Sequence, residues 1–486
     1  MKNAGLKDEI VKEKKPILRN RTYLYLTEFF SGMSVMAVEL GASRLMAPYF
    51  SSSQIVWTII IGTIMIAMAL GNIYGGRSAD KNPDPDKLYG RIIIAAIWIA
   101  LIPVVGKYII LGISALLIFT VSSNFLIIAG FVACMVIFVF PLFLLGLLAI
   151  IYFVSGKPTA SEVRKISCGI VLFILCAVLG HNNSFAFWQN DLLYEGESIY
   201  NYLQVYDNDE EVVLSTNVLF GVQSVYKKQS GLTGMYYDYA MAAPYMSGVK
   251  EKPEMDILVL GNGTGTYATQ CNRYFDNVKI DGVEIDQKIT DLAKEYFELP
   301  DDVKVTTYDG RAYLNAIDDK YDVIMVDAYQ DITIPFQMSS IEFFDLVKEH
   351  LKEDGVMVVN MNMRGSEEGN INQYLADTIS EIFGEVYTAD VSGSTNRELF
   401  ASNNADMLKV YEANLAQEDN KQMQNMMQKV SSDLVAYEAG DYIMTDDRAP
   451  VELLGMKVID ELIKDEVGYY KQIYKEGGVK ALLKML

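Results

Sequence analysis

Four glycine-rich or acidic strand ends constrain the fold of this chain more than any other feature. Each follows an apolar run: Ile257–Leu260 precedes Gly261-Asn262-Gly263-Thr264-Gly265, Lys279–Val283 precedes Glu284, a third run ends on Asp309-Gly310, and Tyr321–Val326 precedes Asp327. The parallel strands of a doubly wound sheet end at one edge, where ligands bind. Four such ends in succession predict a class I Rossmann-like α/β domain with an S-adenosyl nucleotide pocket, and make the C-terminal half a candidate enzyme.

The glycine-rich turn precedes a helix that we expect at 267–274. Glycines let the backbone approach a ligand closely at a helix N-terminus. The G-x-G-x-G spacing differs from the G-x-G-x-x-G of dinucleotide-binding folds and so argues against NAD. We expect Glu284 to accept both ribose hydroxyls, and Asp309 to meet the adenine amino group. The expected nucleotide-binding residues at these strand ends are Gly261, Asn262, Gly263, Thr264, Gly265, Glu284, Asp309 and Gly310.

Asp327 is the candidate for chemistry because it follows a strand and begins a loop, 328–335, before a helix expected at 340–351. A carboxylate at that edge, beside a sulfonium, can orient or deprotonate a nucleophile. It can equally neutralise the sulfonium. The proline and β-branched residues of the loop predict a lid over the site.

Charge divides the chain into two halves. Residues 1–188 hold 16 Lys+Arg and 9 Asp+Glu, whereas the remainder holds 25 and 53. A half with a net charge of −28 repels nucleic acid and favours cationic ligands such as sulfoniums and amines. Neither the four cysteines nor the two histidines have metal-site spacing, so we expect no metal; His350 is expected to be solvated at a helix end.

Residues 1–188, the half with an excess of Lys and Arg, are expected to form an α-helical transmembrane bundle that contacts the lipid bilayer. Apolar stretches occupy about 22–46, 54–74, 91–121, 124–154 and 166–188, most of them near the ~20 residues that cross a bilayer. The Lys/Arg-rich N-terminus is expected in the cytoplasm. Five crossings would place the catalytic half outside, so either the fifth stretch is re-entrant or 91–121 crosses twice; we favour a multi-pass membrane protein with a cytoplasmic catalytic half. Residues 366–440 are expected to be mostly helical.

Together these residues resemble the spermidine synthase (polyamine aminopropyltransferase) family, and in particular its membrane-fused branch. Shorter similarities are the segments 39–50, 75–80 and 445–452. The resemblance implies a small β-region at 195–250 that covers the active site, a catalytic domain at 251–486, and a homodimer. It also implies that Gln223, Tyr237 and Asp238 face the ligand, and that Tyr237 and Asp327 activate the acceptor amine.

Three departures from the family pattern bear on the substrate. The glycine loop of the family reads G-G-G-D-G, and its aspartate holds the free amine of decarboxylated S-adenosylmethionine; Thr264 stands there in this chain. In the family's D-x-x-D-P, Gln330 takes the fourth place of this chain and Asp331 follows it; Asp331 is among the residues expected to bind the nucleotide substrate. The Tyr-Gln of the acceptor site becomes Tyr200-Asn201. An acid at position 264 would repel the carboxylate of intact S-adenosylmethionine, so Thr264 favours the intact substrate.

We therefore expect first an enzyme that cleaves intact S-adenosylmethionine at the aminocarboxypropyl carbon–sulfur bond and releases 5′-methylthioadenosine. The substrate's own carboxylate would attack, forming homoserine lactone, because intramolecular attack has effective molarities of roughly 10⁵ M or more. The alternatives are aminopropyl transfer from decarboxylated S-adenosylmethionine to an amine, and S-adenosylmethionine-dependent methyl transfer. A non-enzymatic alternative is a transporter whose soluble half senses a nucleotide.

Overall fold

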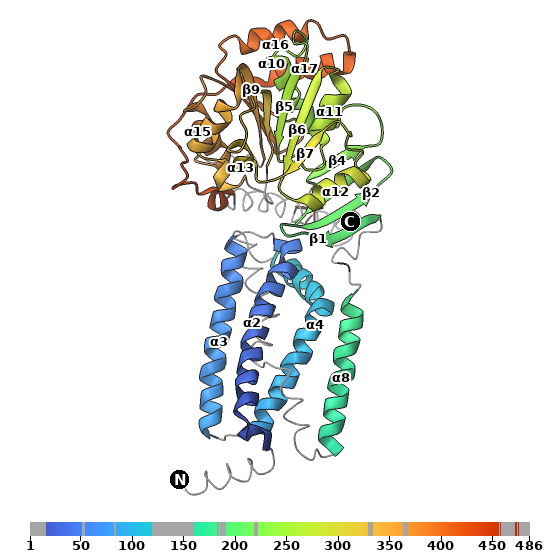
Figure 1. The fold of residues 1–486 in the computed structure, drawn as a ribbon, viewed down its shortest axis with the longest axis vertical. Helices are drawn as coiled ribbons and strands as arrows, with labels where there is room; N and C mark the ends of the chain where they lie inside the picture. The colour runs from blue at the N-terminus through green and yellow to red at the C-terminus, as the bar shows by residue number, and fades with distance from the viewer. Residues whose placement is uncertain are drawn as a thin grey trace. The chain divides into compact units, whose positions relative to one another are not determined.

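The computed structural model describes residues 16–50, 54–81, 84–118, 160–181, 184, 191–217, 222–328, 334–362, 368–455 and a few positions between 457 and 475. Internal contacts divide the chain into two units, Met1–Gln189 and Asn190–Leu486. The first unit holds long helices and the second holds two β-sheets with their covering helices (Figure 1).

The first unit is built from apolar helices. They are η1 (Pro16–Arg19), α2 (Arg21–Phe50), α3 (Gln54–Lys81), α4 (Pro85–Ile118) and α8 (Ala160–His181). Within the described residues, Val56–Ser78 and Pro85–Ile110 are long and apolar enough to cross a membrane. A helix that is apolar on all sides belongs either in a protein core or in lipid. Most of the large apolar side chains of α3 are exposed, as Met65 and Leu70 illustrate, which fits lipid. The predicted stretch 124–154 lies outside the described residues.

A four-stranded antiparallel sheet begins the second unit. Its strands are β1 (Leu192–Glu197), β2 (Tyr202–Asp207), β3 (Glu211–Thr216) and β4 (Ser224–Lys227), in the order β1-β2-β3-β4. Leu203 and Leu214 of this sheet pack with Leu292 and Phe297, so the small sheet is joined to α12 (Gln287–Tyr296).

The large sheet has eight strands. They are β5 (Met255–Leu260), β6 (Val278–Glu284), β7 (Lys304–Thr307), β8 (Tyr321–Val326), β9 (Leu351–Met361), β10 (Glu385–Asp390), β11 (Arg397–Ser402) and β12 (Leu434–Ala436). Their order is β12-β10-β11-β9-β8-β5-β6-β7; β5 to β9 are parallel, and β11 is antiparallel to both β9 and β10. The strand order reverses between β5 and β8, which is where doubly wound sheets bind ligands. This topology confirms the predicted Rossmann-like fold.

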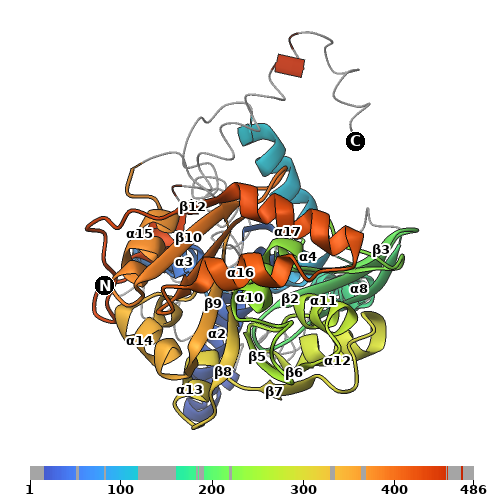
Figure 2. The same ribbon diagram turned by 90° about the horizontal axis from the view of Figure 1, so that it is seen from above.

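Helices cover both faces of the large sheet, each over its own hydrophobic core (Figure 2). One face carries α9 (Tyr236–Ala240), α10 (Ala242–Met246), α11 (Thr266–Tyr274), α16 (Met407–Leu415) and α17 (Lys421–Asp433). The other carries α13 (Gly310–Leu314), α14 (Ile341–Glu349) and α15 (Ile371–Ser380). The prediction of mostly helix for 366–440 was incomplete: α15, α16 and α17 lie there, but β10 and β11 are strands of the large sheet. β11 is buried along most of its length, and burial on both faces removes the polar alternation that would have revealed it.

Candidate active site

The glycine loop packs directly against the backbone at the end of β8. Gly261 has φ of +84°, and a Cβ built there would lie 2.5 Å from the backbone oxygen of Asp327. Gly265, also at φ +84°, is the N-cap of α11, and its Cβ would lie 2.2 Å from a methyl group of Leu299. Only glycine combines this backbone conformation with so close a contact. The structure therefore brings two of the predicted strand ends together.

Glu284 joins the end of β6 to the same loop. Its Oε2 accepts the N–H of Gly263 at 2.9 Å, and its Oε1 accepts the N–H of Asp286 at 3.0 Å. Burial raises the pKa of Glu284 to about 7, although these backbone hydrogen bonds oppose the rise. Glu284 thus lies at the strand edge where the sequence predicted it, with both carboxyl oxygens aligned by backbone donors.

Asp327 is half-buried at the end of β8 between two side-chain donors. The hydroxyl of Tyr236 donates to its Oδ2 at 2.7 Å, and the Nδ2 of Asn360 donates to its Oδ1 at 2.8 Å. Asn396 in turn positions Asn360, because the Nδ2 of Asn396 donates to the Oδ1 of Asn360 at 2.8 Å. Burial raises the pKa of Asp327 to about 7; the two hydrogen bonds lower it, and the charge of Glu284 raises it further. The carboxyl group is therefore held in one orientation, and its pKa lies near neutral pH, as a general base requires.

The structure brings the neighbour of the predicted tyrosine to Asp327, and a ligand contact for Tyr237 remains a prediction. Tyr236, not Tyr237, hydrogen-bonds to Asp327; the hydroxyl of Tyr237 donates to the backbone oxygen of Gln223 at 3.1 Å. The two rings lie side by side, with centroids 4.0 Å apart. The hydroxyl of Tyr237 therefore connects α9 to Gln223, the residue before β4, and does not contact the carboxylate of Asp327.

Two predicted carboxylates have local partners. Asp238 accepts the N–H of Thr233 at 3.0 Å and that of Gly234 at 2.7 Å, so both of its oxygens brace the turn before α9. Asp309 accepts the N–H of Ala312 at 2.8 Å and caps α13, which begins with Gly310. Ligand contacts for these residues remain predictions. Asp331 lies outside the described residues.

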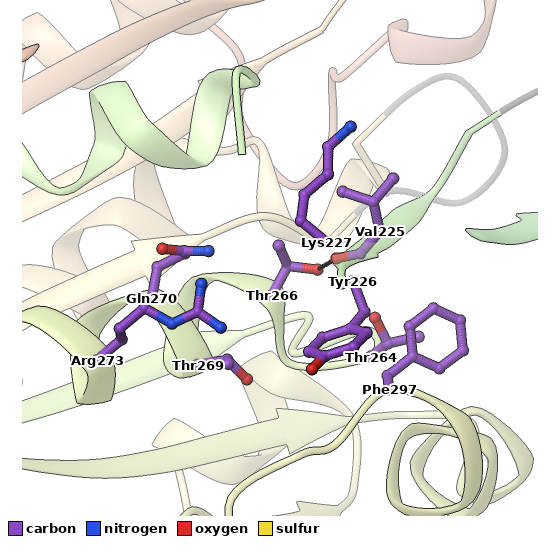
Figure 3. Close-up of a pocket in the computed structure, with 9 residues that line it drawn as sticks. All are labelled: Val225, Tyr226, Lys227, Thr264, Thr266, Thr269, Gln270, Arg273 and Phe297. Atoms are coloured by element: carbon purple, nitrogen blue, oxygen red, sulfur yellow. Dashed lines mark hydrogen bonds between the residues drawn. The ribbon is translucent and has the colours of Figure 1, made fainter. Parts of the chain in front are cut away.

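Polar atoms of the glycine loop are buried without partners in the described part of the chain. They are both amide atoms of Asn262 and the hydroxyl of Thr264. Thr264 lines a hollow of about 10 Å³ between β4 and α11, at the lower limit for one water molecule (Figure 3). Buried polar groups normally have hydrogen-bond partners. The unsatisfied atoms of Asn262 fit a loop that is completed by a polar ligand.

Three residues of this site were missed from the sequence: Tyr236, Asn360 and Glu398. Tyr236 is adjacent to the predicted tyrosine. Asn360 follows the apolar run 356–359 near the end of β9, much as Asp327 follows β8, so a fifth strand end was a usable signal. Glu398, the register partner of Asn360 across β9 and β11, lies in a segment that was predicted to be mostly helical. His350, predicted to be solvated, is buried, with its Nδ1 2.8 Å from the backbone oxygen of Asp319.

The strand order and the carboxylates at one sheet edge define an enzyme domain of the class I Rossmann-like type. A family model for the spermine/spermidine synthase domain matches residues 238–392. A probable polyamine aminopropyl transferase of Bifidobacterium longum is 50% identical over 354 residues, which cover 69% of this chain and 77% of that relative. The chain therefore belongs to the spermidine synthase (polyamine aminopropyltransferase) family, and its apolar N-terminal unit fits the membrane-fused branch.

More distant similarities were also found. The polyamine aminopropyltransferase of Vibrio vulnificus is 25% identical over 241 residues, which cover 48% of this chain and 78% of that relative. A spermidine synthase solved in complex with the transition-state analogue AdoDATO matches with 18% identity and a TM-score of 0.42, covering 50% of this chain and 85% of that chain.

The raised pKa values of Asp327 and Glu284 predict a pH-dependent activity. Because Asp327 accepts a proton only when ionised, we expect kcat/KM to rise with pH along a limb with an apparent pKa near 7. The pKa of each carboxyl group is higher in the folded protein than in the unfolded chain, so the folded protein binds more protons between about pH 4 and about pH 7. The free energy of unfolding of the ligand-free protein should therefore fall as the pH rises through this range. Rate profiles and thermal unfolding over pH 4–9 test this. An activity that is flat from pH 6 to 8 would contradict it.

Proposed function

We propose that this protein transfers the aminopropyl group of decarboxylated S-adenosylmethionine to an amine. The observation that carries the proposal is the half-buried Asp327 carboxylate, oriented by Tyr236 and Asn360 at the switch point of the sheet. The relatives named above support the same reaction. The order of the two reactions expected from the sequence is therefore reversed, with aminopropyl transfer first.

In this reaction the lone pair of the acceptor nitrogen attacks the propyl carbon attached to sulfur. The carbon–sulfur bond breaks, and its electron pair goes to sulfur, so the sulfonium becomes the neutral thioether of 5′-methylthioadenosine. The nitrogen loses a proton to the Asp327 carboxylate, whose pKa of about 7 matches that task. Tyr236 and Asn360 keep the carboxylate in one orientation, and Glu284 holds the ribose at the end of β6.

Product analysis tests the proposal. The purified full-length protein is incubated with decarboxylated or intact S-adenosylmethionine, with and without a diamine, and the products are separated by chromatography. Methylthioadenosine that appears only with decarboxylated substrate and amine supports aminopropyl transfer. Methylthioadenosine released from intact substrate without an amine would indicate carbon–sulfur cleavage instead of aminopropyl transfer. S-adenosylhomocysteine as the product would indicate methyl transfer.

Cleavage of intact S-adenosylmethionine is the second candidate, and Thr264 is the observation that favours it. Its buried hydroxyl occupies the position where the family resemblance implies an aspartate for the free amine. Without that acid, the loop neither attracts the amine of the decarboxylated substrate nor repels the carboxylate of the intact one.

Thr264→Asp, with Thr264→Asn as its matched control, measures this preference. Asparagine has nearly the same shape as aspartate but no charge, so the difference between the variants isolates the electrostatic effect. We expect the ratio of kcat/KM for decarboxylated to intact substrate to rise about 10-fold or more with Asp and to stay near the wild-type value with Asn. An unchanged ratio in the Asp variant would show that position 264 does not select the substrate.

We further infer that the first unit is a multi-pass membrane domain and that the catalytic unit is cytoplasmic. Arg77 and Lys81 at the end of α3, with Lys87 and Arg91 at the start of α4, form a basic connection typical of the cytoplasmic side. The nucleotide substrate is also supplied there. A reporter enzyme that works only outside the cytoplasm, fused to the C-terminus, should be inactive. Activity of this reporter would contradict the proposed orientation.

A further inference from the structure

The segment 445–452, similar to the family in sequence, has no role in the reaction proposed above. It begins with a tight turn: the N–H of Thr445 donates to the backbone oxygen of Arg448 at 3.2 Å, and the N–H of Arg448 donates back at 2.9 Å. Asp446 and Asp447 are the two central residues of this turn, and both are exposed. Two adjacent carboxylates are thus presented on one turn, and their contacts distinguish them.

Asp446 is the centre of a cluster of hydrogen bonds. Its Oδ1 and Oδ2 accept from Nη1 and Nη2 of Arg311 at 2.6 and 2.7 Å, as a bidentate pair. Its Oδ1 also accepts the hydroxyl of Ser340 at 2.5 Å, and its backbone N–H donates to Oε2 of Glu342 at 3.0 Å. The Arg311 guanidinium holds the pKa of Asp446 below its ordinary value. A solvent-exposed ion pair adds little to stability, but a bidentate pair fixes the relative orientation of the groups that it joins.

Arg311 extends this cluster to the short 3₁₀-helix η3 (Phe336–Met338). Its Nη1 donates to the backbone oxygen of Gln337 at 3.1 Å, in addition to Asp446. Ser340, which donates to the same carboxylate, follows η3 by two residues and is the N-cap of α14. Asp446 therefore fixes α13, η3 and the start of α14 relative to one another.

These joined elements include the strand end at Asp309. Met338 of η3 is buried, and a Cβ built on Gly310 would lie 3.1 Å from its Cε, so η3 packs on the backbone next to Asp309. Asp309 is also the N-cap of α13, so its carboxylate moves with that helix. A shift of α13 or η3 thus displaces the carboxylate expected to meet the adenine amino group. Asp327, at the end of β8, keeps its own two donors.

We propose that Asp446 is a positioning residue for adenine recognition: through Arg311 it holds α13 and η3 so that Asp309 meets the 6-amino group of the base. The inference rests on the S-adenosyl nucleotide chemistry of the proposed function and adds to it a residue that acts through another. Loss of the Asp446 charge should weaken the selection of adenine and leave the chemistry at Asp327 unchanged. None of the hydrogen bonds described here involves Asp447.

Equilibrium binding tests this role without requiring turnover. Calorimetry measures the affinity of the full-length protein for 5′-methylthioadenosine and for 5′-methylthioinosine, which has an oxygen in place of the 6-amino group. The variants are Asp446→Asn and its matched control Asp447→Asn, from the same turn. We expect the wild type and the control to bind the adenosine at least about 10-fold more tightly than the inosine, and Asp446→Asn to lower that ratio to about threefold or less. The kcat of Asp446→Asn at saturating substrate should stay within about twofold of the wild-type value, while KM rises.

Arg311→Lys is the second variant, because lysine keeps the charge but lacks the planar fork that contacts both Asp446 and Gln337. It should lower the adenosine-to-inosine ratio in the same way. Because the pair is exposed, the midpoint of thermal unfolding should stay within about 4 °C of the wild-type value in both variants.

An unchanged ratio in Asp446→Asn and Arg311→Lys would overturn the proposal, as would equal affinity of the wild type for the two nucleosides. Equal losses of affinity for both nucleosides, together with a fall of the unfolding midpoint by more than about 10 °C, would assign the cluster a structural role instead. Failure of the proposed reaction is seen separately, as absence of methylthioadenosine release from decarboxylated substrate in a protein that still selects the adenosine nucleoside.

Discussion

Asp327→Asn is expected to lower kcat by about 10³-fold while leaving the affinity for methylthioadenosine within a factor of about three, because a general base contributes roughly 10²–10⁴ in rate. The variant should fold normally. Its side-chain oxygen still accepts from Asn360, and its new amide group donates to the hydroxyl of Tyr236, so the hydrogen bonds that now hold the carboxylate are retained in number. What is lost is the charge and the ability to take a proton.

Single-turnover rates and calorimetry separate these two quantities. Asp318→Asn is the matched control, since Asp318 is an exposed carboxylate in the segment that leads into β8. It should keep the wild-type rate and affinity. Full activity of Asp327→Asn would remove the assigned role of Asp327. A loss of nucleotide affinity equal to the loss of rate would show that its charge serves to bind the sulfonium rather than to accept a proton.

Tyr236→Phe is expected to lower kcat/KM by about 10- to 100-fold, whereas Tyr237→Phe should change it by less than about threefold. Removing the Tyr236 hydroxyl leaves one oxygen of the half-buried Asp327 without its donor, and such a loss costs roughly 1–3 kcal/mol. Tyr237 donates to the backbone oxygen of Gln223 and not to the carboxylate. Two neighbouring tyrosines, whose rings are tilted 33° to each other, thus provide a matched pair in which the hydroxyl of Tyr236 reaches the reacting group and that of Tyr237 donates to Gln223.

The pH profile distinguishes a direct contact from a packing effect. The Tyr236 hydrogen bond lowers the pKa of Asp327, so its removal should move the acid limb of kcat/KM to higher pH. The Tyr237→Phe limb should stay at the wild-type position. Equal rate losses in both variants with no shift of the limb would mean that the two rings contribute through packing alone.

The local chemistry of the chain was sufficient to predict the Rossmann-like fold and the position of several residues at the carboxyl edge of its sheet. An apolar run followed at once by glycine or an acid is a pattern within about ten residues, and Gly261, Glu284 and Asp327 all lie at the sheet edge it predicts. Other contacts depended on the position of a residue on a helix or on the partner of a strand, which the sequence does not show. Successive residues of a helix point about 100° apart, so the sequence could not choose between Tyr236 and Tyr237.

The acidic segment after residue 366 shows the same limit at larger scale. Its acidic and polar composition favoured helix in the prediction, yet β10 and β11 form there because each is paired on both sides within the large sheet. Tertiary pairing overrides weak local preference in this way whenever a strand is buried between layers. Glu398 could not be assigned to the site before that pairing was known.

By itself, the sequence determined that an apolar helical half precedes an acidic Rossmann-like half, and that glycines and carboxylates end successive strands. Only the tertiary structure decided that Asp327, Asn360 and Glu398 share one face of the sheet. The physical reason is that hydrogen-bonded strand pairing, not spacing along the chain, sets which side chains stand next to each other. Residues far apart in sequence become neighbours when β8, β9 and β11 align, and the register of that alignment is specified by the buried cores on either side.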